Sequence, residues 1–372
     1  MSRTLRVASI AGDGIGPEVV AAALPILDRA AALEDAGIAW EHLPLGADHY
    51  LATGETLPQA TFEHLRDDVD AIFVGALGDP RVPGNEHARE ILLGLRFRLD
   101  LYVNFRPVKL YHPDLTPLKP AAARQRGSAA VGAVADPSTR QSLDSPIDFV
   151  IFRENTEGSY LARGTAMGEG TADEEQISHE VHTALKAGRI IRAAFDWARA
   201  HGRTLVTMAD KSNAIPAHRL WQRLFREIGD EYPTIECEHR YVDAIAMEFV
   251  RTPERFQVVV TNNLYGDILS DLGAGLVGGL GLAASANLHP GRPGLFEPVH
   301  GSAPPLAGKG VANPMAACLT GALLFEQVGL PRAAAALEHA VWSALADGVR
   351  TADLGGTAST ASAAQVVLAH LA

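Results

Sequence analysis

The hydrophobic positions of the chain fall into short buried runs that alternate with stretches of helical period. Residues 5–10 predict a buried strand, 12–16 a glycine-rich turn, and 17–32 a helix, because apolar residues recur there every three or four positions. This alternation of strand and helix is typical of an α/β fold. The other predicted elements are strands at 71–75, 148–152, 205–208 and 258–261, a helix around 90–101 and a long amphipathic helix at 179–202.

The composition is that of a globular protein: of the 372 residues, 47% are hydrophobic and 20% are charged. No apolar run approaches the ~18 residues of a membrane span, and the amino-terminal segment lacks a signal-peptide pattern, so we expect a cytoplasmic protein. The net charge of −12 argues against nucleic acid or a membrane as a partner. The two cysteines, Cys237 and Cys318, are too few for a disulfide framework and are predicted to be buried apolar residues.

The glycine-rich turn near the start differs from a dinucleotide-binding fingerprint. Gly12, Gly14 and Gly16 give the spacing G-x-G-x-G, and Pro17 then opens the helix. Glu18 lies in the first helical turn, where its charge opposes phosphate binding. The turn therefore serves either as a tight strand-to-helix connection or as one backbone wall of a cofactor cleft.

Three arginines are candidate ligands of carboxylate groups. Arg96 and Arg106 bracket a helical stretch and the turn after it, and Arg153 ends a predicted strand, with Tyr160 seven residues later. A guanidinium group binds a carboxylate through two parallel hydrogen bonds, which an ammonium group cannot do. Each arginine alone is more often a surface ion-pair residue, so the prediction depends on their convergence.

Acidic residues in apolar surroundings predict a metal site. Asp267 and Asp271 are four residues apart, so on a helix both carboxylates lie on one face, where they can bind one divalent cation. Oxygen ligands favour Mg²⁺ or Mn²⁺ over zinc. The alternative is a solvated acidic face. Asp243 is a third acid in apolar company, and Lys211, directly after a predicted strand, is a candidate for proton transfer.

Taken together, these stretches resemble the β-decarboxylating dehydrogenase family, which includes 3-isopropylmalate, isocitrate, homoisocitrate and tartrate/D-malate dehydrogenases. The resemblance implies a two-domain α/β fold that is not a Rossmann fold, in an obligate homodimer with shared active sites. The larger, cofactor-side domain would comprise residues 1–101 and 278–372, the smaller one 102–277 with the dimer contacts, and 121–146 a mobile insertion. The matching motifs are GDGIGPEV at 12–19, LRFRLDLYVNFRP at 95–107, RENTEGSY at 153–160, DKSNA at 210–214, VDA at 242–244, TNNLYGDILSDLGAGLVGGLGLAASANL at 261–288 and FEPVHGSAPPLAGKGVANPMAA at 296–317.

The same resemblance implies roles for the candidate residues. The arginines would hold substrate carboxylates, and the cation would be bound by Asp267 and Asp271 with Asp243 of the partner subunit. Lys211, also from the partner, would help remove the hydroxyl proton, and Tyr160 would protonate the carbon left after CO₂ departs. The chain would thus be an oxidoreductase that requires magnesium or manganese.

The nicotinamide cofactor would lie along the segment 300–314. The residues implied in its binding are Ile15, His300, Gly301, Ala303, Leu306 and Asn313. The chain departs from its relatives at Pro305, where NAD-using members usually carry an aspartate that binds the ribose. Because Pro305 and Leu306 offer no cation for a 2′-phosphate, we predict NAD as the cofactor.

Leu92 and Leu93 precede Arg96 where the family's isopropylmalate enzymes form the pocket for an isopropyl group. They favour oxidation of 3-isopropylmalate to 2-oxoisocaproate, a step of leucine biosynthesis. Against this, Ala214 stands where isopropylmalate enzymes usually carry valine, and RENTEGSY at 153–160 and the carboxy-terminal DLGGTAST look closer to the tartrate/D-malate branch. A specialised enzyme for another 3-substituted malate is a further alternative. A non-catalytic regulatory subunit is disfavoured, because every implied catalytic residue is present.

Overall fold

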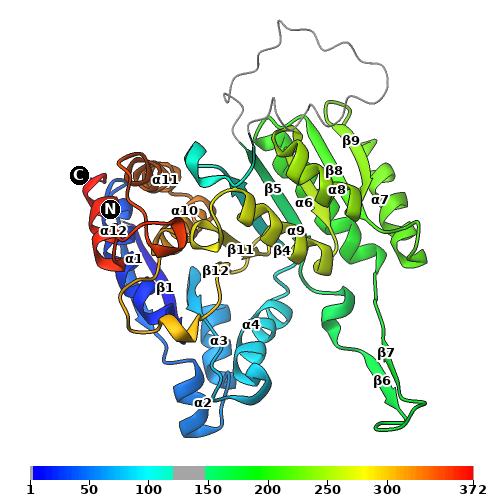
Figure 1. Cartoon of the computed structure of the whole chain (residues 1–372), viewed down its shortest axis with the longest axis horizontal. Helices are drawn as coiled ribbons and strands as arrows, with labels where there is room; N and C mark the ends of the chain where they lie inside the picture. The colour runs from blue at the N-terminus through cyan, green and yellow to red at the C-terminus, as the bar shows by residue number, and fades with distance from the viewer. Residues whose placement is uncertain (1–2, 120–146, 372) are drawn as a thin grey trace, which may run out of the picture. The chain divides into compact units, whose positions relative to one another are not determined.

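The computed structural model describes residues 3–119 and 147–371 (Figure 1). The chain divides into two compact units, each built around strands of a β-sheet. Unit 1 comprises Met1–Leu101, Tyr111–Thr116 and Val277–Ala372, and unit 2 comprises Tyr102–Leu110 and Pro117–Leu276. The segment 121–146, predicted to be a mobile insertion, lies outside the described residues.

Unit 1 has strands in the order β2-β1-β3-β12-β11, parallel except for the antiparallel pair β11 and β12. Its buried strand residues include Val7 and Ile72, and its helices bury apolar residues such as Leu27 and Leu95 against them. Buried parallel strands of this kind need helices on their faces. The strands of unit 1 are β1 (Arg3–Gly12), β2 (Ala36–His42), β3 (Ala71–Ala76), β11 (Ala284–Leu288) and β12 (Gly294–Pro298). Its helices are α1 (Gly16–Ala32), α2 (Ala47–Thr53), α3 (Gln59–Asp67), α4 (Glu86–Arg98), α10 (Met315–Gln327), α11 (Pro331–Ala346) and α12 (Thr360–Ala369).

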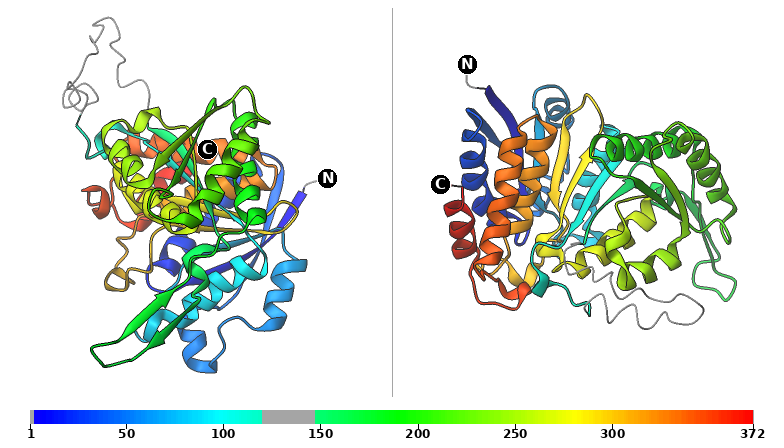
Figure 2. Two further views of the ribbon diagram at one scale, coloured as in Figure 1. Left: turned by 90° about the vertical axis from the view of Figure 1, so that its right-hand side faces the viewer. Right: turned by 90° about the horizontal axis from the view of Figure 1, so that it is seen from above.

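Unit 2 has strands in the order β4-β5-β10-β8-β9, in which β4 runs antiparallel to β5 and the others are parallel. A separate two-stranded hairpin, β6–β7, projects from this unit with every strand residue exposed (Figures 1 and 2). The strands are β4 (Val103–Lys109), β5 (Asp148–Glu154), β6 (Gly164–Met167), β7 (Glu175–Ser178), β8 (Leu205–Asp210), β9 (Glu236–Tyr241) and β10 (Val258–Thr261). The helices are α6 (Ala184–Ala200), α7 (Arg219–Gly229), α8 (Val242–Arg251) and α9 (Asn263–Leu276).

The two faces of the unit 2 sheet are covered by different helices. Successive side chains of a strand point to opposite faces, so Phe149 and Phe152 of β5 lie on opposite sides. The ring of Phe149 lies 4.7 Å from that of Phe249 on α8, whereas Phe152 lies 5.9 Å from Trp197 on α6. Helix α9 packs against β4, β5 and β10, on the face that Phe149 shares with α8, as the right-hand view of Figure 2 shows.

Several sequence predictions need correction at their ends. The helix predicted around 90–101 begins earlier and ends earlier, at Glu86–Arg98. The helix predicted over 179–202 is confined to Ala184–Ala200, because Thr183 caps it: its side chain accepts a hydrogen bond from the Lys186 backbone N–H. Cys237 was predicted to be buried and is exposed, since it lies on β9 at the edge of the sheet. Cys318 is buried as predicted.

Within the described ranges, the helices are too short or too polar to cross a membrane.

Candidate active site

The register of β4 against β5 brings two of the predicted arginines onto one face. In this antiparallel pair Arg106 lies opposite Ile151, and Asn104 lies opposite Arg153. Paired residues share a face, and so do residues two apart on one strand. Arg106 and Arg153 therefore point to the same side of the sheet, which α9 covers. Both side chains are almost fully buried.

The acidic pair lies on α9, directly above these arginines. Nη1 of Arg106 lies 3.4 Å from Oδ1 of Asp267 and 3.2 Å from Oδ1 of Asp271. Nη1 of Arg153 makes a second, shorter ion pair with Asp267, and its Nε donates to Oδ1 of Asn263 at 2.9 Å. The side chain of Ser270 accepts a hydrogen bond from Arg106 at 2.7 Å. Two guanidinium groups and two carboxylates thus converge on one place.

The acids of this cluster are more exposed to solvent than its arginines. The Asp271 side chain is 53% exposed and that of Asp267 34%, so the acids open toward solvent while the arginines lie beneath them. Partial burial, followed by the neighbouring charge of Asp267, raises the pKa of the Asp271 carboxyl, although the guanidinium of Arg106 opposes that rise. A cation bound between the acids would relieve their mutual repulsion.

Tyr160 joins the same cluster from the 3₁₀ turn Gly158–Leu161. Its hydroxyl donates to Oδ2 of Asp267 at 2.6 Å, and the guanidinium of Arg153 lies 5.2 Å from the centre of its ring. Burial and the hydrogen bond to Asp267 raise the pKa of Tyr160. The phenol therefore keeps its proton at neutral pH and is a potential proton donor.

Lys211 and Asp243 form a further ion pair in unit 2. Lys211 directly follows β8, and Asp243 lies in the first turn of α8, with 2.7 Å between Nζ and Oδ2. The hydrogen bond from the ammonium group holds the pKa of Asp243 below its ordinary value. The resemblance assigns both residues to the active site of a partner subunit, Lys211 for proton transfer and Asp243 as a metal ligand.

The third predicted arginine, Arg96, lies in unit 1, on α4. Its Nη2 donates to Oε1 of Glu297 at 2.6 Å, and the same oxygen accepts from Nδ2 of Asn287 at 2.9 Å. Leu92 and Leu93, on the same helix, are partly buried, and Leu92 packs against the hydrophobic core of unit 1. Glu297 and Asn287 were not identified as candidates from the sequence, where no spacing links them to Arg96.

Ile15, one of the predicted cofactor residues, lies in the glycine-rich turn of unit 1. The backbone N–H of Ile15 donates to the carbonyl of Ser302 at 2.8 Å, so the turn contacts the segment that begins at His300. Ala303 has a positive φ of 39°, which is costly for a residue with a side chain. Such strain is often found where a backbone is shaped for a ligand.

Of the other cofactor candidates, His300 and Asn313 differ in whether their polar side-chain atoms have hydrogen-bond partners. Nδ1 of His300 contacts the carbonyl of Gly301 at 3.2 Å, while its Nε2 is buried without a hydrogen-bond partner among the described residues. Burial lowers the pKa of His300, so the ring is neutral at neutral pH. Asn313 donates to Asp353 at 3.1 Å, and Leu306 is exposed. A buried, unsatisfied ring nitrogen suits a polar ligand group.

Glu18 has a function that the sequence reasoning missed. Its carboxylate accepts the backbone N–H groups of Gly310 at 3.2 Å and Ala312 at 3.1 Å, together with the hydroxyl of Thr360. The acid that opposes phosphate binding therefore holds the far end of the 300–314 segment against α1. The only signal in the sequence was its position in the first helical turn.

Known proteins are similar to this chain over nearly its whole length. A model of the family described as isocitrate/isopropylmalate dehydrogenase matches residues 6–368. The chain is 42% identical over 362 residues to the 3-isopropylmalate dehydrogenase of Thermobifida fusca, covering 96% of this chain and 95% of that protein. It is 43% identical over 346 residues to that of Beutenbergia cavernae, with 92% and 93% covered. Its fold matches the crystal structure of isocitrate dehydrogenase from Methylococcus capsulatus with a TM-score of 0.83 and 36% identity, over 99% of both chains.

Proposed function

The chain belongs to the isocitrate/isopropylmalate dehydrogenase family and is a decarboxylating dehydrogenase, and on this premise we propose that it oxidises 3-isopropylmalate to 2-oxoisocaproate with NAD. The observation that carries the proposal is the convergence of Arg106, Arg153 and Tyr160 on the carboxylates of α9. The choice of substrate is supported by the curated relatives, which are named 3-isopropylmalate dehydrogenases, and by the apolar pair Leu92 and Leu93.

The donor atoms on α9 fit a hard divalent cation. Asp267 and Asp271 are one helical turn apart, and both contact the same nitrogen of Arg106, so their oxygens face a common point. Carboxylate oxygens are ligands for Mg²⁺ or Mn²⁺, and Asp243 of a partner subunit would complete the set. When bound, the cation supplies a positive charge beside the oxygen on which negative charge develops.

The side chains of the chain divide the remaining work. Arg106 and Arg153, with Arg96 as a third, bind the carboxylates of the substrate and keep the leaving carboxylate in line. The neutral amine of Lys211 would take the proton of the C2-hydroxyl. NAD, when bound, would supply the hydride acceptor. Tyr160 holds a proton at its phenolic oxygen and delivers it to C3 after CO₂ departs, and its raised pKa keeps that proton available.

The cofactor proposal is supported by the segment 300–314. The unsatisfied Nε2 of His300 fits a polar group of a nucleotide, and the strained backbone at Ala303 fits a segment shaped around a ligand. Neither Pro305 nor Leu306 carries a charge that would bind a 2′-phosphate. These features favour NAD over NADP.

A homodimer is proposed on the exposed apolar side chains of unit 2. Met167 and Ile177 lie exposed on the β6–β7 hairpin, and Met247 and Val250 lie exposed on α8 beside Ile268 of α9. Large exposed apolar groups on adjoining elements mark interaction surfaces. In such a dimer Lys211 and Asp243 would serve the site of the other subunit.

The test is the rate of nicotinamide reduction with Mg²⁺ or Mn²⁺ on 3-isopropylmalate, D-malate, tartrate, isocitrate and homoisocitrate, each with NAD and NADP. A kcat/KM for 3-isopropylmalate at least about tenfold above the others, or ~1.4 kcal/mol, supports the proposal. A lead for D-malate or tartrate would contradict the role of the leucine pair and favour the tartrate/D-malate branch.

A matched pair of variants tests the metal role. Asp267→Asn removes one carboxylate of α9 and should abolish metal-dependent turnover. Asp67→Asn makes the same chemical change at an exposed acid that pairs with its neighbour Arg66, and should leave turnover unchanged. Equal turnover in both variants would remove the proposed role of Asp267.

A further inference from the structure

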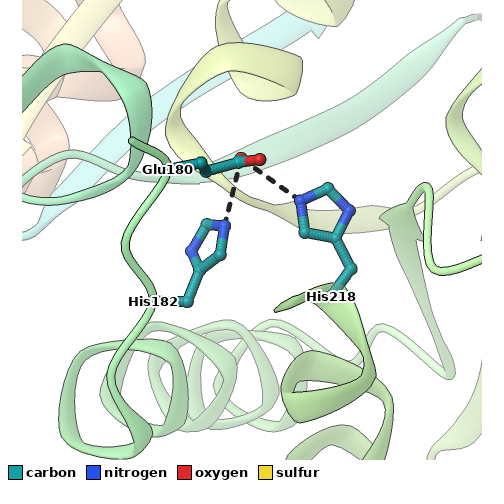
Figure 3. A group of neighbouring side chains, drawn as sticks. All are labelled: Glu180, His182 and His218. Carbon is teal, nitrogen blue, oxygen red and sulfur yellow. Dashed lines mark hydrogen bonds and ion pairs between the residues drawn. The ribbon is translucent and has the colours of Figure 1, made fainter. Parts of the chain in front are cut away.

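Three titratable side chains form a second cluster in unit 2, beside the lysine. Glu180, His182 and His218, here called the Glu180 cluster, present nitrogen and oxygen atoms that all lie within 4.8 Å of one another (Figure 3). Oε1 of Glu180 lies 3.2 Å from Nε2 of His218 and 3.0 Å from Nε2 of His182. Both imidazole side chains are almost completely buried.

The spacing resembles a metal site, but the tautomer of His218 argues against one. The backbone N–H of Lys211 donates to Nδ1 of His218 at 3.0 Å, so Nδ1 carries no hydrogen. The neutral ring must then carry its hydrogen on Nε2 and donate it to Glu180. A histidine bound to a metal through Nε2 usually donates a hydrogen bond from Nδ1, which is impossible here.

The hydrogen bonds instead connect two elements of the proposed site. His218 ends the 3₁₀ turn Pro216–His218 and reaches back to the first residue after β8. On its other side, Glu180 also accepts from Nδ2 of Asn262 at 3.3 Å. Oδ1 of Asn262 in turn accepts the backbone N–H of Tyr265 at 2.9 Å, in the first turn of α9. The cluster therefore links the backbone of Lys211 to the start of the helix that carries Asp267.

Each ring nitrogen of His218 has its own partner, which fixes the ring in one orientation. The carboxylate of Glu180 favours the hydrogen on Nε2, and this leaves Nδ1 as the acceptor that Lys211 requires. The Lys211 backbone carbonyl also accepts from the backbone N–H groups of Ala214 and Ile215 at 2.9 and 2.8 Å. The peptide groups on both sides of Lys211 are thus held, so the direction in which its side chain leaves the backbone is set.

We infer that His218, oriented by Glu180, is a positioning residue that aims Lys211 for proton transfer. The inference rests on the proposed function, in which Lys211 takes the hydroxyl proton. The hydrogen bond between His218 and Lys211 is made by the backbone N–H of Lys211. Any influence of His218 on the reaction therefore passes through that backbone. Displacing a reacting group by about an ångström can cost on the order of 100-fold in rate.

Two substitutions separate the two hydrogen bonds of the ring. In His218→Asn the amide oxygen can stand where Nδ1 stands, so the bond to Lys211 is kept and the contact with Glu180 is lost. In His218→Gln the longer side chain reaches toward Glu180 but offers no acceptor at the Nδ1 position. We expect kcat to fall about 10- to 100-fold in His218→Gln and much less in His218→Asn, with the KM values for substrate and NAD unchanged in both.

Two further measurements distinguish positioning from general damage. In a Lys211→Ala background, His218→Gln should cause no additional loss of the residual kcat, because its effect passes through the lysine. The exchange of the Lys211 amide hydrogen should accelerate in His218→Gln and stay slow in His218→Asn. Equal losses of kcat and of melting temperature in both variants would overturn the inference and leave a structural role.

The outcomes also separate this inference from the proposed function. If the wild-type enzyme reduces NAD with none of the five substrates, the proposed function fails, whereas amide exchange at Lys211 still tests the hydrogen bond from which the inference starts. A visible absorption band of bound Co²⁺ in the presence of excess Mg²⁺, lost in His182→Ala and retained in Asp267→Asn, would reveal a metal in the Glu180 cluster. That result would contradict the tautomer of His218 and overturn the inference.

Discussion

A single methyl group added to α9 should disturb the arginine beneath it. A Cβ atom built on Gly266 would lie 2.5 Å from both Cβ and Cγ of Arg153 and 3.1 Å from its Cδ. Ordinary contacts between carbon atoms are about 3.5–4.0 Å, so roughly an ångström must open between the helix and β5. Gly266 therefore allows the close approach that brings Asp267 to Arg153.

Arg153 has little freedom to yield to that methyl group. Its side chain is almost fully buried, Nε donates to Asn263, and Nη1 pairs with Asp267. The clash is with carbons next to the backbone of a strand, and these cannot turn away as the end of a long side chain could. The helix or the guanidinium must therefore shift.

The free energy of unfolding follows from two opposing terms. Alanine in place of glycine inside a helix ordinarily stabilises by about 1 kcal/mol. Overpacking of a buried site costs about 1–3 kcal/mol. We therefore expect Gly266→Ala to lower the free energy of unfolding by between 0 and about 2 kcal/mol. Because Arg153 is a proposed substrate ligand, an ångström of displacement should also lower kcat/KM on the order of 100-fold.

The matched control lies in the same helix. Gly275 is exposed, and a Cβ atom there would meet nothing within 4 Å. Gly275→Ala should raise the free energy of unfolding by up to about 1 kcal/mol and leave kcat/KM unchanged. Both variants are compared by urea unfolding and by NAD reduction. Full activity and a gain in stability in Gly266→Ala would refute the proposed close packing of α9 on Arg153.

Three other changes test separate parts of the structure. Phe249→Ala should lower the free energy of unfolding by about 3–5 kcal/mol in urea titrations, because the ring is fully buried between two other phenylalanine rings at 4.7 and 4.9 Å. Glu18→Gln should raise KM for NAD about tenfold, because it weakens hydrogen bonds to a charged group that hold the 300–314 segment. KM for the substrate should stay unchanged. Equal changes in both KM values would contradict a role confined to the 300–314 segment. The contacts of Glu180 with His182 and His218 lower its pKa from 4.5 to about 2. A carboxyl whose pKa is lowered by folding stabilises the fold at pH values above its pKa in the unfolded chain. The free energy of unfolding should therefore fall between about pH 4.5 and 2, as the Glu180 carboxylate is protonated. In Glu180→Gln this fall should be shallower.

Five buried strands could be predicted from local apolar runs and correspond to β1, β3, β5, β8 and β10, whereas the convergence of side chains could not be predicted. The apolar run at 148–152 was sufficient to place Arg153 at the end of a strand. That Arg106 shares its face follows only from the register of β4 against β5, which pairs Arg106 with Ile151 across 45 residues of sequence. Register depends on long-range packing and leaves no local trace in a single sequence.

Two of the residues that sequence reasoning missed act through the backbone. Glu18 and His218 both bind backbone N–H groups of segments distant in the chain. Such contacts require only an acceptor in the right place, so they carry no motif of residue types. The hairpin β6–β7 was missed for a different reason: every residue of its two short strands is exposed, so the sequence shows no buried run and no alternation of apolar and polar positions there.

The charges of the cluster explain why its acids and arginines can coexist before any ligand binds. Two neighbouring carboxylates repel each other without a positive counter-charge, and the sequence predicted a divalent cation beside this pair. In the structure the guanidinium groups of Arg106 and Arg153 provide that counter-charge, so two positive and two negative groups balance. A divalent cation alone would add charge beside the arginines, and a dicarboxylate alone would add charge beside Asp267 and Asp271. Under the proposed function, the two bound together would preserve the balance and separate the ion pairs, with arginine on a substrate carboxylate and aspartate on the cation. The resting ion pairs would therefore favour joint binding of the proposed metal and substrate over binding of either one alone.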